Sequence, residues 1–330
     1  MTSTETPAPT LDRSDPAGAI AEAAERYRNW GRWGPDDVRG TLNFLTDDVR
    51  AGAARLVRRG RSISLSQTFD AEGPQNGWRR RTNPIHTMLD TGAEAARGTQ
   101  GFPHGFGGAD DVVFMPLQCS TQWDGLGHIF DRGKAWNGRS CDEVVTSEGD
   151  QVTGIDTLAH DVAGRGVLLD VGRAIGTDGE LPDGFAITAE HLEATIEAQG
   201  PTSVVRRGDL LLVRTGRFAR ARREGWGEYA GGAAPGLSFT TAAWLHASEI
   251  AAIATDTWGF EVRPNEFDGA FQPLHQIVIP NMGLLVGEMW DLDTLGDDCA
   301  EHGVYEFFLT AAPLRVTGAV GAPLNPIAVL

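Results

Sequence analysis

Two nearly continuous apolar runs constrain the fold of this chain most. They cover Gly164–Val171 and Gly208–Thr215, and runs of this length and composition are typical of central strands that are buried on both faces. Between them, Thr188 is a candidate cap for a helix that extends to Gln199 and stops at Gly200. The order strand, helix, strand predicts an α/β layer.

Weaker patterns predict further elements around this layer. Helices are expected over Ala19–Trp30, from Thr46 or Asp47 to Arg58, and from Thr240 or Thr241 to Ser248, and strands over Arg61–Ser66 and Ile250–Thr255. Residues 1–18 are rich in Thr, Pro, Ala and Ser, so we expect a flexible N-terminal arm. No internal repeat or linker divides the remainder, so residues 19–330 are expected to form one α/β domain.

Charge and cysteine content narrow the class of protein. The chain has 45 acidic and 28 basic residues, a net charge of −17, which opposes binding to nucleic acid or to an anionic membrane. No apolar run is long enough to cross a bilayer, and the N-terminus lacks the pattern of a secretory signal. Three cysteines without a Cys-x-x-Cys spacing fit a reducing compartment. We therefore expect a cytoplasmic protein.

The region from Ala71 to Asp111 has little periodicity, many glycines and a basic patch at Arg79–Arg81. A loop of this length is usually functional or mobile. We expect it to fold over a site, with one helical turn around Thr91–Arg97. The alternative is a surface excursion without chemistry.

One polar stretch, Gln118–His128, combines amides, a carboxylate and an imidazole, and it follows the apolar run Val112–Leu117. Polar side chains at the exit of a strand are a common way to place a site on a rigid element. The pair Asp124 and His128 is separated by three residues, a spacing that is frequent by chance. The stretch therefore indicates a site without defining its chemistry.

A second stretch, Phe271–Trp290, predicts a helix that carries His275, a turn at Pro280–Gly283, and a strand that ends at Glu288. Imidazole and carboxylate groups are ligands for divalent metals, and Asp124 would complete a set of three. The alternatives are a hydrogen-bonded core histidine and a solvated strand end. Asp256 follows a predicted strand and is a candidate to orient a ligand, or else a turn residue.

Other catalytic motifs are absent from the sequence. There is no G-x-S-x-G elbow and no phosphate-binding loop, and the glycines near Gly105 do not follow a strand as a dinucleotide fingerprint requires. Cys119 has no cationic neighbour in the sequence that would activate its thiol, so we interpret it as a small buried residue.

Together these stretches resemble the metal-dependent cyclase family, which includes bacterial arylformamidase (kynurenine formamidase) and isatin hydrolase. The family motif H-x-G-T-H-x-D-x-P-x-H aligns with residues 118–128 on Thr121, Asp124 and His128, and the family's downstream His and Glu resemble His275 and Glu288. Both early histidine ligands of the family are glutamines here, Gln118 and Gln122. Further similarities lie at Asn29–Asn43, Leu210–Gly216, Ala254–Trp258 and Gly318–Pro323, so the resemblance spans most of the chain.

The resemblance implies a swivelling β/β/α fold, a homodimer or homotetramer, and one divalent metal. Its ligands would be Asp124, His275 and Glu288, helped by Gln122 and Gln118. Because amide oxygen is a harder ligand than imidazole, Mn²⁺ is expected ahead of Zn²⁺ or Mg²⁺. The substrate pocket would include Trp123, Trp258, Asp256 and His86, with packing in the core as the favoured alternative for each tryptophan.

The implied function is hydrolysis of a C–N bond in a cyclic or aryl amide, or of a lactone, in a small-molecule substrate. Asp124 would hold the metal, and His128 would act as general base and then as general acid. One alternative is a cyclase or dehydratase of polyketide-type intermediates that uses His128 and Asp124 without net hydrolysis. Another is a binding protein on a catalytically decayed scaffold. The reason for this alternative is that glutamines replace both early histidine ligands of the family.

Overall fold

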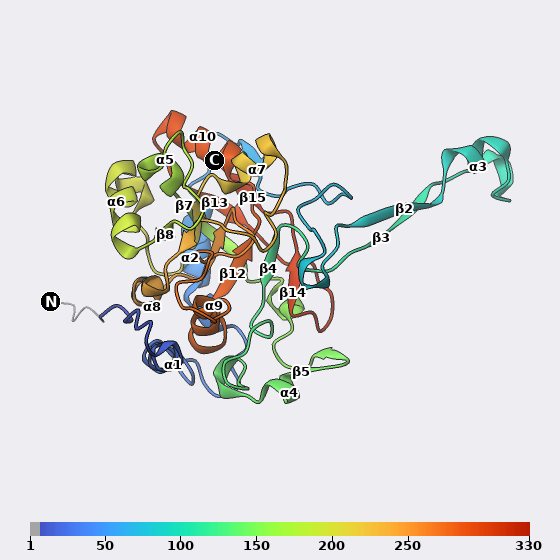
Figure 1. Ribbon diagram of the computed structural model, residues 1–330. Coiled ribbons are helices and arrows are strands. Elements are labelled where there is room, and N and C mark those ends of the chain that lie inside the picture. The colour runs from blue at the N-terminus through green and yellow to red at the C-terminus, as the bar shows by residue number, and fades with distance from the viewer. Residues whose placement is uncertain (1–6) are drawn as a thin grey trace.

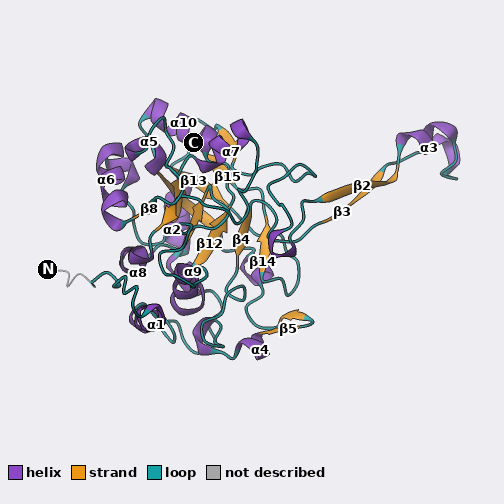
Figure 2. Cartoon of the chain, viewed as in Figure 1, coloured by secondary structure: helices purple, strands orange, loops and turns teal. Residues whose placement is uncertain are grey.

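A curled mixed sheet of nine strands runs through the body of the protein (Figures 1 and 2) in the computed structural model, which describes residues 7–330. In spatial order its strands are β1 (Ser62–Ser64), β15 (Ile327–Val329), β13 (Glu306–Thr310), β7 (Ala163–Asp170), β9 (Leu210–Arg214), β11 (Ala252–Thr255), β12 (Leu285–Glu288), β4 (Gln122–Asp124) and β14 (Gly321–Pro323). The four strands from β7 to β12 are parallel, and the pairs outside them are antiparallel.

The central strands are buried on both faces, as the apolar runs predict. In β9, Leu210 and Leu212 belong to one hydrophobic core, whereas Leu211 and Val213 belong to another. Because successive side chains of a strand point to opposite faces, these two cores lie on opposite sides of the sheet. The predicted α/β layer is confirmed.

The helices cover both faces of the sheet (Figures 1 and 2). Side chains of α1, α6, α8 and α9 enter one core, and α10 and the segment around α2 enter the other. The α-helices are α1 (Pro16–Arg26), α2 (Asp47–Ala54), α3 (Gly92–Arg97), α4 (Cys141–Val144), α5 (Val171–Ile175), α6 (Ala189–Gln199), α7 (Arg217–Glu224), α8 (Ala242–Ser248), α9 (Pro273–Ile277) and α10 (Asp293–His302).

Short elements connect these layers. Single 3₁₀ turns occupy Gly40–Phe44, Trp78–Arg80, Pro103–Gly105, Trp136–Gly138, Ile155–Leu158, Pro201–Ser203 and Phe239–Thr241, and a π-helical turn occupies Val278–Met282. Three two-stranded pairs lie outside the large sheet: β2 (Ile85–Asp90) with β3 (Asp110–Phe114), β5 (Val145–Thr146) with β6 (Gly149–Asp150), and β8 (Ala186–Ile187) with β10 (Gly236–Leu237).

The predicted helices are present with shifted ends. The first begins at Pro16, inside the segment that was expected to be mobile, because Asp15 caps it by accepting a hydrogen bond from the Gly18 amide at 3.0 Å. Upstream of it, the carbonyl of Pro7 accepts a hydrogen bond from Tyr27 Oη at 2.6 Å, which holds residue 7 against the body. Residues 1–6 of the expected flexible N-terminal segment lie outside the described residues.

The region Ala71–Asp111 divides at Asn83 into a part that lies against the body and a part that extends away from it. Beyond Asn83 it does not fold over a site: β2 and β3 form an antiparallel ribbon, with α3 at its tip, that extends away from the body (Figure 1). The predicted helical turn is α3, whose first turn carries a capping box between Thr91 and Glu94. The apolar run Val112–Leu117 therefore belongs in part to this ribbon, which we call the arm (residues 85–114), and not to the strand that carries the site.

No helix within residues 7–330 combines the length and apolar character needed to cross a membrane.

Candidate metal centre and active site

Two neighbouring strands of the large sheet carry the polar residues of the site. β4 and β12 pair antiparallel, with Gln122 opposite Glu288 and Asp124 opposite Val286. Alternation along β4 places Gln122 and Asp124 on one face and Trp123 on the other. The pairing explains why side chains that are 166 residues apart in sequence meet at one point.

Three of the predicted ligands converge there. Asp124, His275 and Glu288 offer one oxygen or nitrogen atom each, and these atoms lie within 4.8 Å of one another. All three residues are buried, with at most 2% of their surface exposed. A buried set of one imidazole and two carboxylates at this spacing has the composition of a divalent metal site.

Glu261 holds His275 in position. Its Oε1 accepts hydrogen bonds from His275 Nδ1 at 2.6 Å and from the His275 amide at 2.9 Å, and its Oε2 accepts from the Leu274 amide at 3.2 Å. The same carboxylate thus caps the first turn of α9 and engages Nδ1, so that Nε2 faces Glu288 at 3.0 Å. Carboxylates commonly orient metal-binding histidines in this way.

The centre has more negative than positive charge. Burial would lower the pKa of His275, but its hydrogen bonds to Glu261 and Glu288 outweigh burial and raise this pKa to about 10. Burial, reinforced by the charge of Asp124, raises the pKa of Glu288 to about 7. Glu288 therefore retains its charge poorly at neutral pH in the absence of a further cation.

Gln122 lies between the two carboxylate ligands. Its Nε2 donates hydrogen bonds to Asp124 Oδ1 at 3.2 Å and to Glu288 Oε2 at 3.0 Å. Its Oε1 is buried and has no hydrogen-bond partner among residues 7–330, and such an atom is costly unless something else binds it. This unpartnered oxygen fits a cation site beside Asp124 and Glu288.

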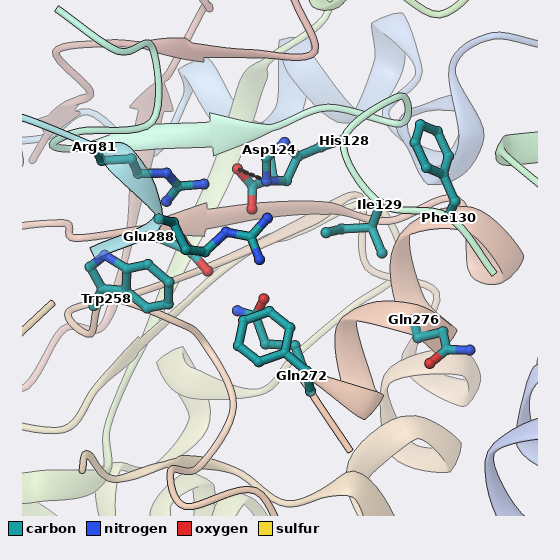
Figure 3. Close-up of a pocket in the computed structure, with 11 residues that line it drawn as sticks. Arg81, Asp124, His128, Ile129, Phe130, Trp258, Gln272, Gln276 and Glu288 are labelled. Atoms are coloured by element: carbon teal, nitrogen blue, oxygen red, sulfur yellow. Dashed lines mark ion pairs between the residues drawn. The ribbon is translucent and has the colours of Figure 1, made fainter. Parts of the chain in front are cut away.

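His128 stands next to this cluster but outside it. Its Nε2 is 3.7 Å from Asp124 Oδ1 (dashed line in Figure 3), and its side chain keeps 17% of its surface exposed. Burial lowers the pKa of His128 below its usual value, against the opposing charge of Asp124. The imidazole is therefore neutral at pH 7 and can accept a proton.

Thr121 supports the site without facing it. Its Oγ1 accepts a hydrogen bond from the Gln67 amide at 3.1 Å and donates one to the carbonyl of Met289 at 2.6 Å. Met289 follows Glu288 directly and has a φ of 59°, in the left-handed region that non-glycine residues rarely adopt. The threonine thus helps to fix the backbone just beyond the Glu288 ligand.

A cavity of about 360 Å³ opens onto these groups (Figure 3). Besides Asp124, His128 and Glu288, it is lined by Arg79, Arg81, Ile129, Phe130, Trp258, Phe271, Gln272 and Gln276. In Figure 3, Arg81 and Trp258 lie on one side of the cavity and Ile129 and Phe130 on the other, with Asp124 between them. The mixture of aromatic and polar walls is typical of a small-molecule site.

Of the expected pocket residues, only Trp258 lines this cavity. Trp123 points into the core, where its Nε1 donates to the carbonyl of Ala311 at 2.7 Å. Asp256 is a buried turn residue: its carboxylate accepts hydrogen bonds from Thr215 and Gly216 at 2.8 Å. The pocket role is therefore wrong for both residues, and the alternatives, core packing for Trp123 and a turn for Asp256, are confirmed.

His86, which was expected in the pocket, and Gln118, which was expected as a metal ligand, also lie away from the cavity. His86 is on the arm, where its Nε2 is 2.9 Å from Asp111 Oδ2, and it does not line the cavity. Gln118 lies against Gly321 of β14 and is not among the lining residues. Of the two glutamines that replace histidines of the family motif, only Gln122 reaches the ligand cluster.

Sequence reasoning missed Glu261, Gln272 and the two arginines of the cavity wall. Gln272 Nε2 lies 3.3 Å from His275 Nε2, and its position one helical turn before His275 was a usable signal. The basic patch at Arg79–Arg81 was visible in the sequence, but its position at the same cavity as Asp124 was not. Glu261 had no local signal, because its role depends on a contact with a helix 13 residues further along the chain.

Comparison with known proteins agrees with the fold. Residues 63–262 match the family model described as "Putative cyclase". A crystal structure described as a novel cyclase is 37% identical, with a TM-score of 0.84 over 92% of this chain and 99% of that one. Two isatin hydrolases share the fold. Isatin hydrolase A from Ralstonia solanacearum is 16% identical, with a TM-score of 0.58 over 84% of this chain and 94% of that one. Isatin hydrolase A from Labrenzia aggregata is 18% identical, with a TM-score of 0.56 over 87% of this chain and 98% of that one. No curated protein matches the sequence.

The mixed sheet defines a single-domain α/β protein with the fold of isatin hydrolase A, and it carries a buried Asp/His/Glu cluster. The chain belongs to the cyclase family, as the match over residues 63–262 and the 37% identical structure show.

Proposed function

We propose that this protein hydrolyses a C–N bond of a cyclic or aryl amide, with lactones as a related substrate class, and that it requires one divalent metal. The observation that carries the proposal is the buried cluster of Asp124, His275 and Glu288 with the unpartnered Oε1 of Gln122 nearby. Asp124 and Glu288 of this cluster line an aromatic-walled cavity. The fold shared with isatin hydrolases supports it.

Asp124, His275, Glu288 and Gln122 would hold the metal. Three of these four groups offer oxygen, which favours Mn²⁺ over Zn²⁺ by the ligand preferences of the two ions. When bound, the metal would polarise the scissile carbonyl and lower the pKa of the attacking water.

The protein's own groups carry the proton. His128 Nε2 would take a proton from the water whose oxygen attacks the carbonyl carbon. It would then return that proton to the leaving nitrogen as the C–N bond breaks, which yields a carboxylic acid and an amine. The lowered pKa of His128 keeps it in the basic form at neutral pH. Trp258 and Phe271 would hold an aromatic ring against the cavity wall.

Metal analysis and activity together test the proposal. Wild-type protein purified without chelator should carry about one metal per chain by elemental analysis, and EDTA should remove both the metal and the hydrolysis of aryl formamides and cyclic amides. Asp124→Asn should lose the metal, whereas the matched control Asp268→Asn, at an exposed site, should keep it. Stoichiometric absence of metal together with EDTA-resistant hydrolysis would refute the metal requirement.

Isotope labelling separates hydrolysis from cyclisation or dehydration. In water labelled with ¹⁸O, hydrolysis must place one labelled oxygen in the acid product. A product formed without label would exclude the proposed reaction and favour a cyclase or dehydratase.

A further inference from the structure

We infer that Arg79 and Arg81 form an anion-recognition pair on the cavity wall, and that the preferred substrate is an aryl amide that also bears a carboxylate. For the reaction this inference rests on the proposed function. The binding preference that it predicts does not depend on turnover.

Neither arginine forms an ion pair with another residue in the described part of the chain. Neither guanidinium has a carboxylate within 4.0 Å among residues 7–330. Arg165 and Arg214, in contrast, each form ion pairs with two different acidic residues. In a chain of net charge −17, two arginines that line one cavity without an ion pair point to a negative charge supplied by a ligand.

Aromatic rings hold these side chains in place and leave their hydrogen-bonding edges free. Arg81 stacks over Trp258 at 5.4 Å, and Arg79 stacks over Phe271 at 5.3 Å, measured from Cζ to the ring centroid. A third arginine, Arg263, lies 5.9 Å from the Trp258 ring and has its buried Nε and Nη1 without a partner in the described chain. Stacked guanidinium groups are suited to bind a planar carboxylate with two parallel hydrogen bonds.

The backbone that carries the pair is held in an uncommon conformation. Gly77, Arg79 and Arg80 have φ values of 92°, 52° and 62°, so two non-glycine residues in succession occupy the left-handed region. Such strain persists where the surroundings enforce it, and it concentrates at functional sites. Here the tight turn at Trp78–Arg80 brings Arg79 and Arg81 to the cavity, which Arg80 does not line; Arg79 and Arg80 are both exposed.

A structural role for the pair is the competing interpretation, because Asp124 and Glu288 line the same cavity. Figure 3 shows the Arg81 side chain reaching toward Asp124, yet no ion pair forms between them within the 4.0 Å limit. A divalent cation bound by Asp124 and Glu288 would neutralise these carboxylates and leave the arginines as the excess charge. A substrate with its ring beside Trp258 and Phe271 then has its anionic group next to them.

Calorimetry with a non-reacting probe tests the pair directly. Benzenesulfonate, a weak metal ligand that mimics a carboxylate, should bind the Mn²⁺-loaded wild type at least tenfold more tightly than its neutral analogue methyl phenyl sulfone. The variant R79Q/R81Q should bind both probes equally, and the adjacent control R80Q should keep the wild-type preference. Equal binding of both probes by wild type, or an undiminished preference in R79Q/R81Q, would overturn the inference. R81K, which keeps the charge but not the planar fork, should retain only part of the preference.

Turnover separates this inference from the proposed function. The ratio of kcat/KM for carboxylated formanilides to that for formanilide should exceed ten in wild type and R80Q and approach one in R79Q/R81Q, mainly through KM. If no amide is hydrolysed but the sulfonate preference holds, the proposed function fails and the anion site stands. If amides are hydrolysed with the same ratio in wild type and R79Q/R81Q, the anion site fails and the proposed function stands.

Discussion

At the scale of single residues, His128 is the imidazole that the ligand cluster leaves free. His275 is engaged on both ring nitrogens by Glu261 and Glu288, whereas His128 contacts the cluster only through Asp124, at 3.7 Å. It also faces the cavity and stays partly exposed. This geometry supports the proposed division between the metal ligands and His128 as the proton carrier.

His128→Gln should therefore keep the metal and lose turnover. We expect kcat to fall by about 10²–10⁴, the usual contribution of a positioned general base, while elemental analysis gives the wild-type metal content. Loss of the metal in this variant would instead identify His128 as a ligand.

The three thiols should differ in reactivity. Burial raises the pKa of Cys119 to about 11 and that of Cys299 to about 12, so their reactive thiolate forms are nearly absent at pH 8. Cys141 is only partly buried. Iodoacetamide at pH 8 followed by peptide mass spectrometry should label Cys141 in the native protein, and all three residues after denaturation. Labelling of native Cys119 at the rate of Cys141 would contradict its burial.

Single residues of the site were predictable where they lie in a recognisable local pattern. Asp124, His275 and Glu288 were expected together, and the structure brings them together. Trp123 was misplaced because its direction depends on the pairing of β4 with β12, which one strand of three residues does not reveal. Glu261 was missed because its partners come from another segment of the chain.

At the scale of secondary-structure elements, the hydrogen bonds between Glu261 and α9 fix the position of His275. α9 has only five residues, so it gains little stability from its own hydrogen bonds. The Glu261 carboxylate supplies its N-terminal cap and the contact to His275 Nδ1 at once.

Glu261→Gln should weaken metal binding by about 10- to 100-fold, the usual effect of removing a carboxylate that orients a histidine ligand. Mn²⁺ titration monitored by EPR measures this change, and circular dichroism checks the fold. Glu266→Gln, which alters a different carboxylate cap, at Phe239, is the matched control and should bind Mn²⁺ normally. Unchanged affinity in Glu261→Gln would show that α9 places His275 without this carboxylate.

Elements with strong periodicity were predicted well. The central strands, the helix capped at Thr188 and the helix, turn and strand from His275 to Glu288 are all present. Element ends were less accurate, since α2 stops at Ala54 and not at Arg58. β4, the strand that carries two site residues, was not recognised because three residues are too few to show an alternating pattern.

At the scale of the whole molecule, the arm is the feature that a single chain leaves incomplete. It exposes large apolar side chains on a two-stranded ribbon, among them Ile85 (57% exposed), Leu89 (67%), Phe106 (68%) and Phe114 (72%). An isolated ribbon of two strands is marginally stable in water, and several large apolar side chains exposed on one ribbon favour an interaction site. We expect a second copy of the chain to cover it.

Light scattering after gel filtration should therefore report a homodimer or homotetramer. Replacing Leu89 and Phe106 with Ser should shift the protein towards the monomer, whereas replacing Leu314, an exposed apolar residue outside the arm, should not. A wild-type protein that stays monomeric at micromolar concentration would contradict this expectation. The arm could not be predicted from the sequence because its strands lack the polar and apolar alternation of a half-buried hairpin.

The pairing of β4 with β12 has a consequence for biosynthesis. Gln122 and Glu288 are separated by 166 residues, and His275 lies close to the later of the two. A nascent polypeptide that has emerged only as far as β11 cannot bind the cation, however well its earlier strands have formed. If the cluster binds a metal, as proposed, capture would be confined to chains that have folded almost completely, and the bound ion would lock the segments of Gln122 and Glu288 together against unfolding by mass action.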